Sequence, residues 1–194
     1  MIDPREIVSS IFGAWRLVHR DPGGLRYFDV SLAGFWRSFF AAVIAFPGYV
    51  ILVLVRIGDR LTAEGALHAL TLEAFAYAIG WTAFPLAAFY AVRLFNRERR
   101  YLGYIVAYNW AAVLQVALYV PTVLLVSFGL FPKPLDTVIA LAVTIAVMVY
   151  QYYIARVALE VVPAQAVGFV VLDLVISLVL HAVVEALQAP DLAP

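Results

Sequence analysis

Apolar side chains occur in five long runs along the chain, and short polar connections separate these runs. The runs cover residues 38–55, 66–92, 101–128, 135–155 and 164–187. A helix needs about 20 apolar residues to cross roughly 30 Å of hydrocarbon, and each run reaches that range. Backbone groups that face lipid find hydrogen-bond partners only inside a helix or a closed barrel. The pattern therefore predicts an all-α, polytopic membrane domain of five transmembrane helices over residues 38–187, with a short tail over residues 188–194.

The first 37 residues show a different pattern, which is amphipathic. Between residues 4 and 20, apolar side chains recur on one face of a 3.6-residue helix and arginines occupy the other face. The sequence DPRE provides an N-cap at Asp3 and a proline at the first helical position. The sequence DPGG at residues 21–24 is typical of a turn. We expect an interfacial helix on the membrane surface that precedes the spans, with packing against the bundle or a partner as the alternative. Its candidate membrane-surface residues are Arg5, Trp15, Arg16 and Arg20.

Composition excludes most soluble protein classes. Hydrophobic residues make up 65% of the 194 residues and charged residues only 13%, against about 45–50% and about 25% in ordinary soluble domains. A soluble domain needs more polar side chains than this to cover its outside. The chain contains no cysteine, which excludes disulfides, thiolate metal sites and thiol nucleophiles.

Positive charges are distributed unevenly between the connections. With the N-terminus in the cytoplasm, ten of the thirteen Lys and Arg residues lie on the cytoplasmic side, within residues 1–37, residues 93–100 and the connection at Arg156. The positive-inside rule then predicts a multi-pass protein of the inner membrane, with a cytoplasmic segment 1–37 and an exoplasmic (periplasmic) tail 188–194.

Polar side chains interrupt the inner part of two predicted spans. A carboxylate in mid-bilayer costs about 2.5–3.5 kcal/mol on insertion scales, so it normally faces protein or water. From the rise per residue of a helix, Asp173 and Asn109 reach the same level of the bilayer. We expect Asp173 to be hydrogen-bonded by Asn109, by Gln151 or by a nearby tyrosine. Gln115 lies at the centre of its span.

A second set of polar side chains lies toward the outer ends of the spans. Antiparallel neighbours would bring Glu73 level with His181, and His68 level with Glu185, as two acid–imidazole pairs. A proton or solute path is one interpretation. Interhelical hydrogen bonds worth about 0.6 kcal/mol each are the structural alternative. The candidate intramembrane polar site comprises Glu73, Asn109, Gln115, Asp173 and His181.

Catalytic sequence motifs are absent. The chain has no GxxxxGK[ST] loop, no HExxH, no GxSxG and no paired-aspartate metal motif. Its three histidines have no metal-ligand spacing, and the basic run NRERR at residues 96–100 is explained by membrane topology. We therefore expect no enzymatic activity, no cofactor, no metal and no nucleic-acid partner.

Two stretches resemble parts of the Yip1 family of five-span membrane proteins. The third span of that family is similar to YLGYIVAYNWAAVLQVALYVPTVLL, residues 101–125, where a glycine–tyrosine start is followed by a proline. The turn between its fourth and fifth spans is similar to IARVALEVVPAQAVGFVVLDLV, residues 154–175. The resemblance implies a five-span architecture over about residues 30–187 and a non-enzymatic role. The Ala- and Arg-rich composition is typical of a bacterial protein.

Two functional hypotheses remain open at this point. The first is a non-enzymatic, bacterial-type inner-membrane protein that organises the bilayer or protein partners through the helix at residues 4–20. The second is a small proton-coupled transporter whose path is lined by Asp173, Asn109, Glu73 and His181. An accessory subunit of a membrane complex is a third possibility. Beyond the lipid bilayer, the expected partners are other proteins or further copies of this chain.

Overall fold

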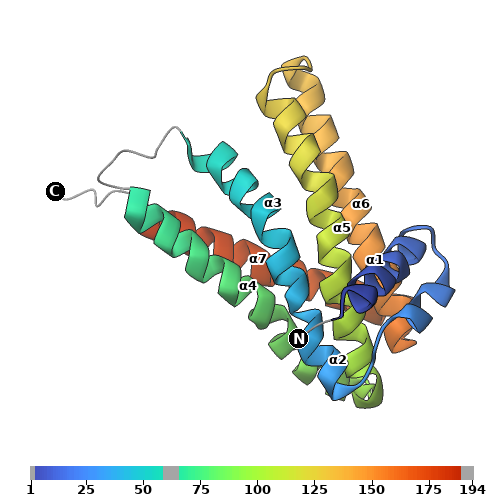
Figure 1. Cartoon of the computed structure of the whole chain (residues 1–194). Coiled ribbons are helices and arrows are strands. Elements are labelled where there is room, and N and C mark those ends of the chain that lie inside the picture. The colour runs from blue at the N-terminus through green and yellow to red at the C-terminus, as the bar shows by residue number, and fades with distance from the viewer. Residues whose placement is uncertain (1–2, 59–65, 189–194) are drawn as a thin grey trace.

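The computed structural model describes residues 3–58 and 66–188, and within them it contains helices and connections but no β-strand. The predicted all-α class is confirmed. The predicted tail 188–194 lies outside the described residues, apart from Gln188. In chain order the elements are α1 (Pro4–Val18), η1 (Pro22–Tyr27), α2 (Leu32–Ser38), α3 (Phe40–Ile57), α4 (Ala66–Leu94), η3 (Glu98–Arg100), α5 (Tyr101–Ser127), α6 (Lys133–Leu159) and α7 (Pro163–Gln188) (Figure 1).

Five helical segments of the described chain are long and apolar enough to cross a membrane. They cover Leu32–Ile57, Ala66–Leu94, Glu98–Ser127, Lys133–Leu159 and Pro163–Gln188. Large apolar side chains lie exposed along the outer faces of all five, which lipid tolerates and water does not. The chain is therefore a multi-pass membrane protein, as predicted. The first span starts earlier than the sequence pattern indicated, because α2 leads into α3 with a break only at Phe39.

The helices pack as pairs that lean apart. α5 and α6 form an antiparallel hairpin, α7 packs along α4, and α3 lies along α5. The α5–α6 hairpin and the α4–α7 pair diverge from the end of the molecule that carries α2 and η3 (Figure 1). We call that end the α2 end, and the opposite end, where α6 begins at Lys133, the Lys133 end.

Small side chains allow the close approach of α3 and α5. Ala41 and Ala45 of α3 are buried, as are Ala107 and Ala111 of α5. A side chain on Gly48 would collide with Val116 of α5. In contrast, the similarly spaced Ala74 and Ala78 of α4 are exposed.

The N-terminal segment is fastened to the α2 end of the bundle. As predicted, the Asp3 carboxylate caps α1 by accepting the Arg5 backbone N–H at 2.9 Å, and Pro4 begins the helix. Glu6 pairs with Arg37 of α2 at 2.8 Å. The Tyr150 hydroxyl of α6 donates to the Ala14 carbonyl at 2.8 Å. Helix α1 thus packs directly on α5 and α6.

The main hydrophobic core also lies toward the α2 end. Phe84, Tyr104, Trp110 and Phe169 form its centre, and Leu17 brings α1 into the same cluster. The Asp29 carboxylate accepts the Ser31 backbone N–H, which lowers the pKa of Asp29, and nearby Arg37 lowers it further. The main core and the interactions of Asp29 therefore lie at the α2 end, where α1 also packs.

Candidate functional site

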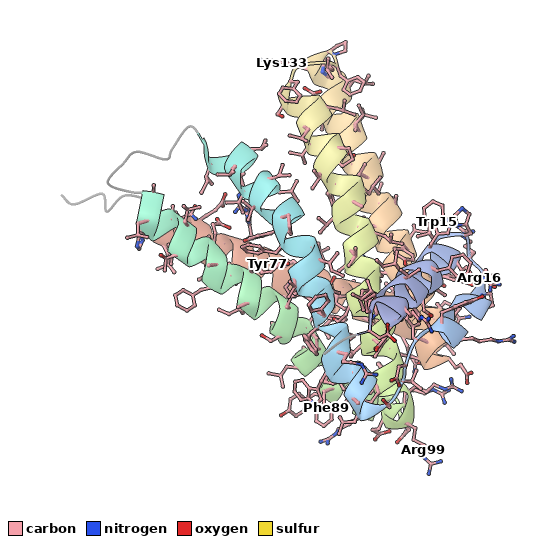
Figure 2. All side chains as sticks on the ribbon, viewed as in Figure 1. Trp15, Arg16, Tyr77, Phe89, Arg99 and Lys133 are labelled. Atoms are coloured by element: carbon pink, nitrogen blue, oxygen red, sulfur yellow. The ribbon has the colours of Figure 1, made fainter. Side chains whose placement is uncertain are left out.

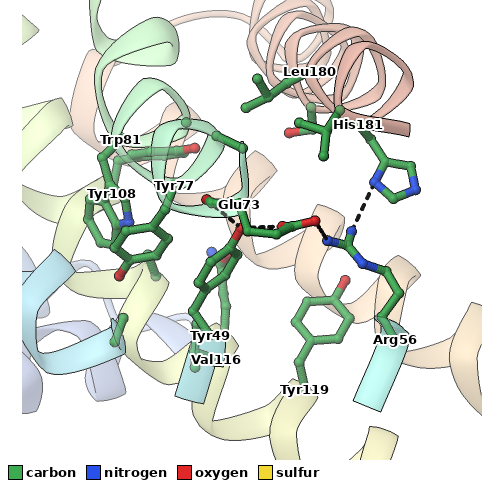
Figure 3. A pocket seen from close by; sticks show the side chains of 17 residues that line it. Tyr49, Arg56, Glu73, Tyr77, Trp81, Tyr108, Val116, Tyr119, Leu180 and His181 are labelled. Carbon is green, nitrogen blue, oxygen red and sulfur yellow. Dashed lines mark hydrogen bonds and ion pairs between the residues drawn. The ribbon is translucent and has the colours of Figure 1, made fainter. Parts of the chain in front are cut away.

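A cavity of about 370 Å³ lies between α3, α4, α5 and α7. Glu73, Gln115 and His181 of the predicted polar site line it. The wall also contains small and aliphatic residues and five aromatic side chains, which are drawn in Figure 3: Tyr49, Tyr77, Trp81, Tyr108 and Tyr119. Tyr49 and Tyr77 pack with ring centroids 4.4 Å apart. These large side chains fill the contact between α3 and α4 and leave the cavity beside them.

Glu73 is the most enclosed charged group of the cavity, with 4% of its side chain exposed. Its carboxylate accepts the Tyr49 hydroxyl at 2.8 Å, an Arg56 N–H at 2.5 Å and the Gln188 amide at 2.8 Å. These donors come from α3 and α7, whereas Glu73 itself lies on α4. Burial of a carboxylate is tolerated when such partners replace water, so these three donors hold the Glu73 side chain in place.

Arg56 continues this network to the last span. Its second terminal nitrogen lies 3.1 Å from Nδ1 of His181 (Figure 3). Because arginine only donates hydrogen bonds, Nδ1 must accept, which assigns the proton of a neutral His181 to Nε2. Nε2 lies 3.4 Å from the Glu185 carboxylate, one helical turn along α7. Glu73, Arg56, His181 and Glu185 therefore form a continuous polar chain.

Asp173 and Asn109, which were predicted to lie together, have different hydrogen-bond partners in the structure. Asp173 accepts the Tyr108 hydroxyl at 2.7 Å, and the Gln151 side chain also hydrogen-bonds to it, so two of the three expected partners are present. Tyr108 also lines the cavity, which links Asp173 to its wall. Asn109 instead donates to the Ser38 hydroxyl at 2.9 Å and is fully buried against α2. Asn109 is therefore not a partner of Asp173, although the two were expected at one level.

The outer acid–imidazole pairs also differ from the expected pairs. Glu73 and His181 do lie near each other, but Arg56 stands between them. His68 lies 3.4 Å from the Leu187 carbonyl, while Glu185 contacts His181. The predicted His68–Glu185 pair is therefore absent from the hydrogen bonds of the described residues.

Sequence reasoning missed Arg56 and Tyr49. Arg56 directly follows the apolar run 38–55 and is one of the basic residues outside the spans, and Tyr49 lies inside that run. The sequence signal for Arg56 is its position directly after the first span, because the next span carries an acid, Glu73, near the same end. Within residues 3–58 and 66–188, no three His, Asp or Glu side chains gather closely enough to hold a metal ion.

The surface of α1 is the second candidate site. Ser10, Gly13, Ala14 and Leu17 are buried against the rest of the protein. Trp15 projects away from the bundle (Figure 2), and Val8, Phe12 and Val18 are likewise exposed.

The three predicted arginines differ in their surroundings, and Arg20 lies two residues beyond the end of α1. Arg5 and Arg20 are exposed. Arg16 is paired with Asp21 and also donates to the Tyr27 hydroxyl at 3.1 Å. The Gly23 backbone N–H and Arg16 together lower the pKa of Asp21. Arg16 therefore holds the turn after α1 in place.

Comparison of the chain with models of protein families, with curated proteins and with solved structures gives no match. The family resemblance noted in the sequence therefore remains a hypothesis, and function is inferred from the two sites themselves.

Proposed function

We propose that this protein is a non-enzymatic, Yip1-like integral protein of a bacterial-type inner membrane, which organises the bilayer or protein partners through α1. The observation that carries the proposal is the double-sided character of α1. One face is packed onto the bundle, and the other presents an exposed apolar strip of Val8, Phe12, Trp15 and Val18.

The exposure of this strip supports an interfacial role. Val8 is 69% exposed and Trp15 is 53% exposed. Helix α1 cannot rotate to bury them, because Ala14 and Leu17 already occupy the contact with the bundle. A strip that contains tryptophan and is bordered by Arg5 matches the chemistry of the headgroup–acyl boundary of an anionic leaflet.

The test uses the absence of native cysteine. A polarity-sensitive thiol dye is attached to Phe12→Cys, to Trp15→Cys or, as the control on the polar edge, to Arg5→Cys, and each protein is reconstituted in vesicles containing anionic lipid. We expect shallow lipid-borne quenchers to act on positions 12 and 15, and aqueous iodide to act mainly on position 5. Equal iodide quenching at all three positions would contradict a membrane-surface strip.

The role in organisation needs a separate measurement. Replacing Val8, Phe12 and Trp15 together by serine keeps the buried face of α1 intact. We expect this variant to insert normally and to lose the proteins that co-purify with the parent in mild detergent, or to lose its effect on vesicle shape. Unchanged co-purification and unchanged vesicle shape would refute the role of α1.

The proposed orientation places the N-terminus in the cytoplasm and the C-terminus outside. Arg99 lies at the α2 end and Lys133 at the opposite end (Figure 2). In intact cells we expect a membrane-impermeant thiol reagent to label Lys133→Cys and not Arg99→Cys. Labelling of only Arg99→Cys would reverse the orientation.

A small proton-coupled transporter is the second candidate, and the cavity between α3, α4, α5 and α7 favours it. Asp173 would act on the cavity through Tyr108. In proteoliposomes with a trapped pH dye, a transporter would lose proton flux on Asp173→Asn substitution, whereas the organising function would tolerate that change.

A further inference from the structure

We infer that the cavity between α3, α4, α5 and α7 binds a single-chain anionic amphiphile. A carboxylate or phosphate head would lie at Arg56, and the hydrocarbon chain would lie among the aromatic side chains. This binding site is independent of the proposed role of α1.

The cavity has a polar mouth and an apolar interior. Arg56, Tyr119 and His181 line it toward the Lys133 end, whereas Ala45 and Tyr108 line its inner part. Arg56 follows Ala45 by eleven positions on α3, which corresponds to about 16 Å along the helix. The cavity therefore runs along the helix axes, the direction in which lipid chains lie.

The position of the mouth fits a headgroup. Arg56 is the second-last residue of α3, so it lies where the first span ends. Headgroups of the leaflet at the Lys133 end occupy this level of a bilayer. A ligand that keeps its polar head at Arg56 places its chain at hydrocarbon depth without crossing the membrane.

Unused hydrogen-bond donors at the mouth, rather than its net charge, favour an anionic head, because Glu73 balances the charge of Arg56. The Glu73 carboxylate is occupied by three donors, so it offers little to an incoming cation. Arg56 is 40% exposed and uses only two of its nitrogen atoms, toward Glu73 and His181. Its remaining N–H groups suit a carboxylate or phosphate, which guanidinium binds in a fork geometry.

Tyr119 adds a second donor at the mouth. Its hydroxyl lies beside Arg56 (Figure 3) and makes no hydrogen bond to other side chains or backbone within the described residues. An aromatic cage for a quaternary ammonium is the alternative that the tyrosines raise. The guanidinium of Arg56 opposes it, because its unused N–H groups need an acceptor and a quaternary ammonium provides none.

The volume limits the size of the ligand. A cavity of about 370 Å³ holds roughly a dozen groups the size of a water molecule, at about 30 Å³ each. This matches one medium-length alkyl chain with a small head and excludes a diacyl lipid held entirely inside. A fatty acid and an alkyl phosphate share the required chemistry.

Trp81 in the cavity wall provides a direct reporter of the chain. In a Trp15→Phe/Trp36→Phe background the remaining tryptophans are Trp81 and the buried Trp110. The protein is placed in nanodiscs of zwitterionic lipid and titrated with a fatty acid brominated in mid-chain, because bromine quenches indole fluorescence on contact. Parallel titrations use a brominated alkyl phosphate, the corresponding alcohol and the corresponding trimethylammonium compound.

We expect saturable quenching by the acid and the phosphate, and affinities lower by about tenfold or more for the alcohol and the ammonium compound, because a charge-assisted hydrogen bond is lost. The Arg56→Gln/Glu73→Gln variant, which removes both charges of the pair, should abolish the preference for the acid. Lys133→Gln, outside the cavity at the same end, should retain it. Adding Trp81→Phe should remove the saturable signal.

Three results would overturn the site. Equal, unsaturable quenching by all four amphiphiles would mean partition into the bilayer only. Full competition by inorganic phosphate alone would mean an anion site without a chain. Preference for the ammonium compound would mean an aromatic cation site.

Discussion

The Arg56–Glu73 pair predicts an unequal response to removal of its two partners. The pair joins α3 to α4 at 2.5 Å, but the Arg56 side chain is 40% exposed and the Glu73 side chain only 4%. Arg56→Gln leaves a buried carboxylate with two neutral donors, Tyr49 and Gln188. Glu73→Gln leaves a guanidinium that can turn to water or headgroups and still bond to the new amide.

The magnitudes follow from these surroundings. Removing one partner of a fully buried pair costs about 3–5 kcal/mol, and the exposure of Arg56 reduces the figure for Arg56→Gln to about 2–3 kcal/mol. Glu73→Gln should cost only about 1–1.5 kcal/mol, the value of a weakened hydrogen bond. The double variant buries no charge, so it should lose no more than about 1–2 kcal/mol, with a coupling energy near 2 kcal/mol.

The assay is reversible unfolding in mixed micelles, in which the free energy of unfolding is followed as the fraction of denaturing detergent rises. Lys133→Gln serves as the control for loss of one positive charge at the same end of the protein. Equal costs for the two single variants, or additive costs in the double variant, would refute the assignment of Glu73 as the enclosed member of the pair.

Three further predictions concern other parts of the fold. Gly48→Ala should cost about 1–3 kcal/mol through overpacking, and Val116→Ala, at the side chain that it strikes, should restore part of this loss in the same unfolding assay. Tyr150→Phe should cost about 1 kcal/mol and speed proteolysis after Arg20, because the Ala14 carbonyl of α1 loses the hydrogen bond that Tyr150 of α6 donates. The lowered pKa of Asp29 means that its stabilising contribution is complete above pH 3.8 and is lost as the pH falls through its lower folded value. Thermal unfolding from pH 5 down to pH 2 should show this loss, and Asp29→Asn should flatten it.

The architecture could be predicted because the length of each apolar run can be counted in the sequence and compared with the thickness of a membrane. Each apolar run became one membrane-length helix, and the capping signals at Asp3 and Pro4 placed the start of α1 correctly. The break at Phe39 could not be predicted, since the run from residue 32 to residue 57 contains no helix-stopping residue there.

The level of the site residues in the bilayer could be predicted from the sequence, but the helix face on which each residue lies could not. Residues 108 and 109 lie at one level of α5, yet they are about 100° apart around the helix. Tyr108 therefore faces Asp173 on α7, while Asn109 faces Ser38 on α2. Rise per residue gives the level of a side chain, but its rotation depends on how neighbouring helices pack.

The α5–α6 hairpin extends well beyond the hydrophobic core. No residue from 112 to 146 is buried by other parts of the protein, so the outer half of the hairpin is supported on most sides by its surroundings alone. In lipid, opening a backbone hydrogen bond is costly because no water replaces it. Amide hydrogen exchange in this half should therefore be slow in a bilayer and much faster in a short-chain detergent. Lipid therefore provides most of the packing contacts of the outer half of the hairpin, in place of other helices.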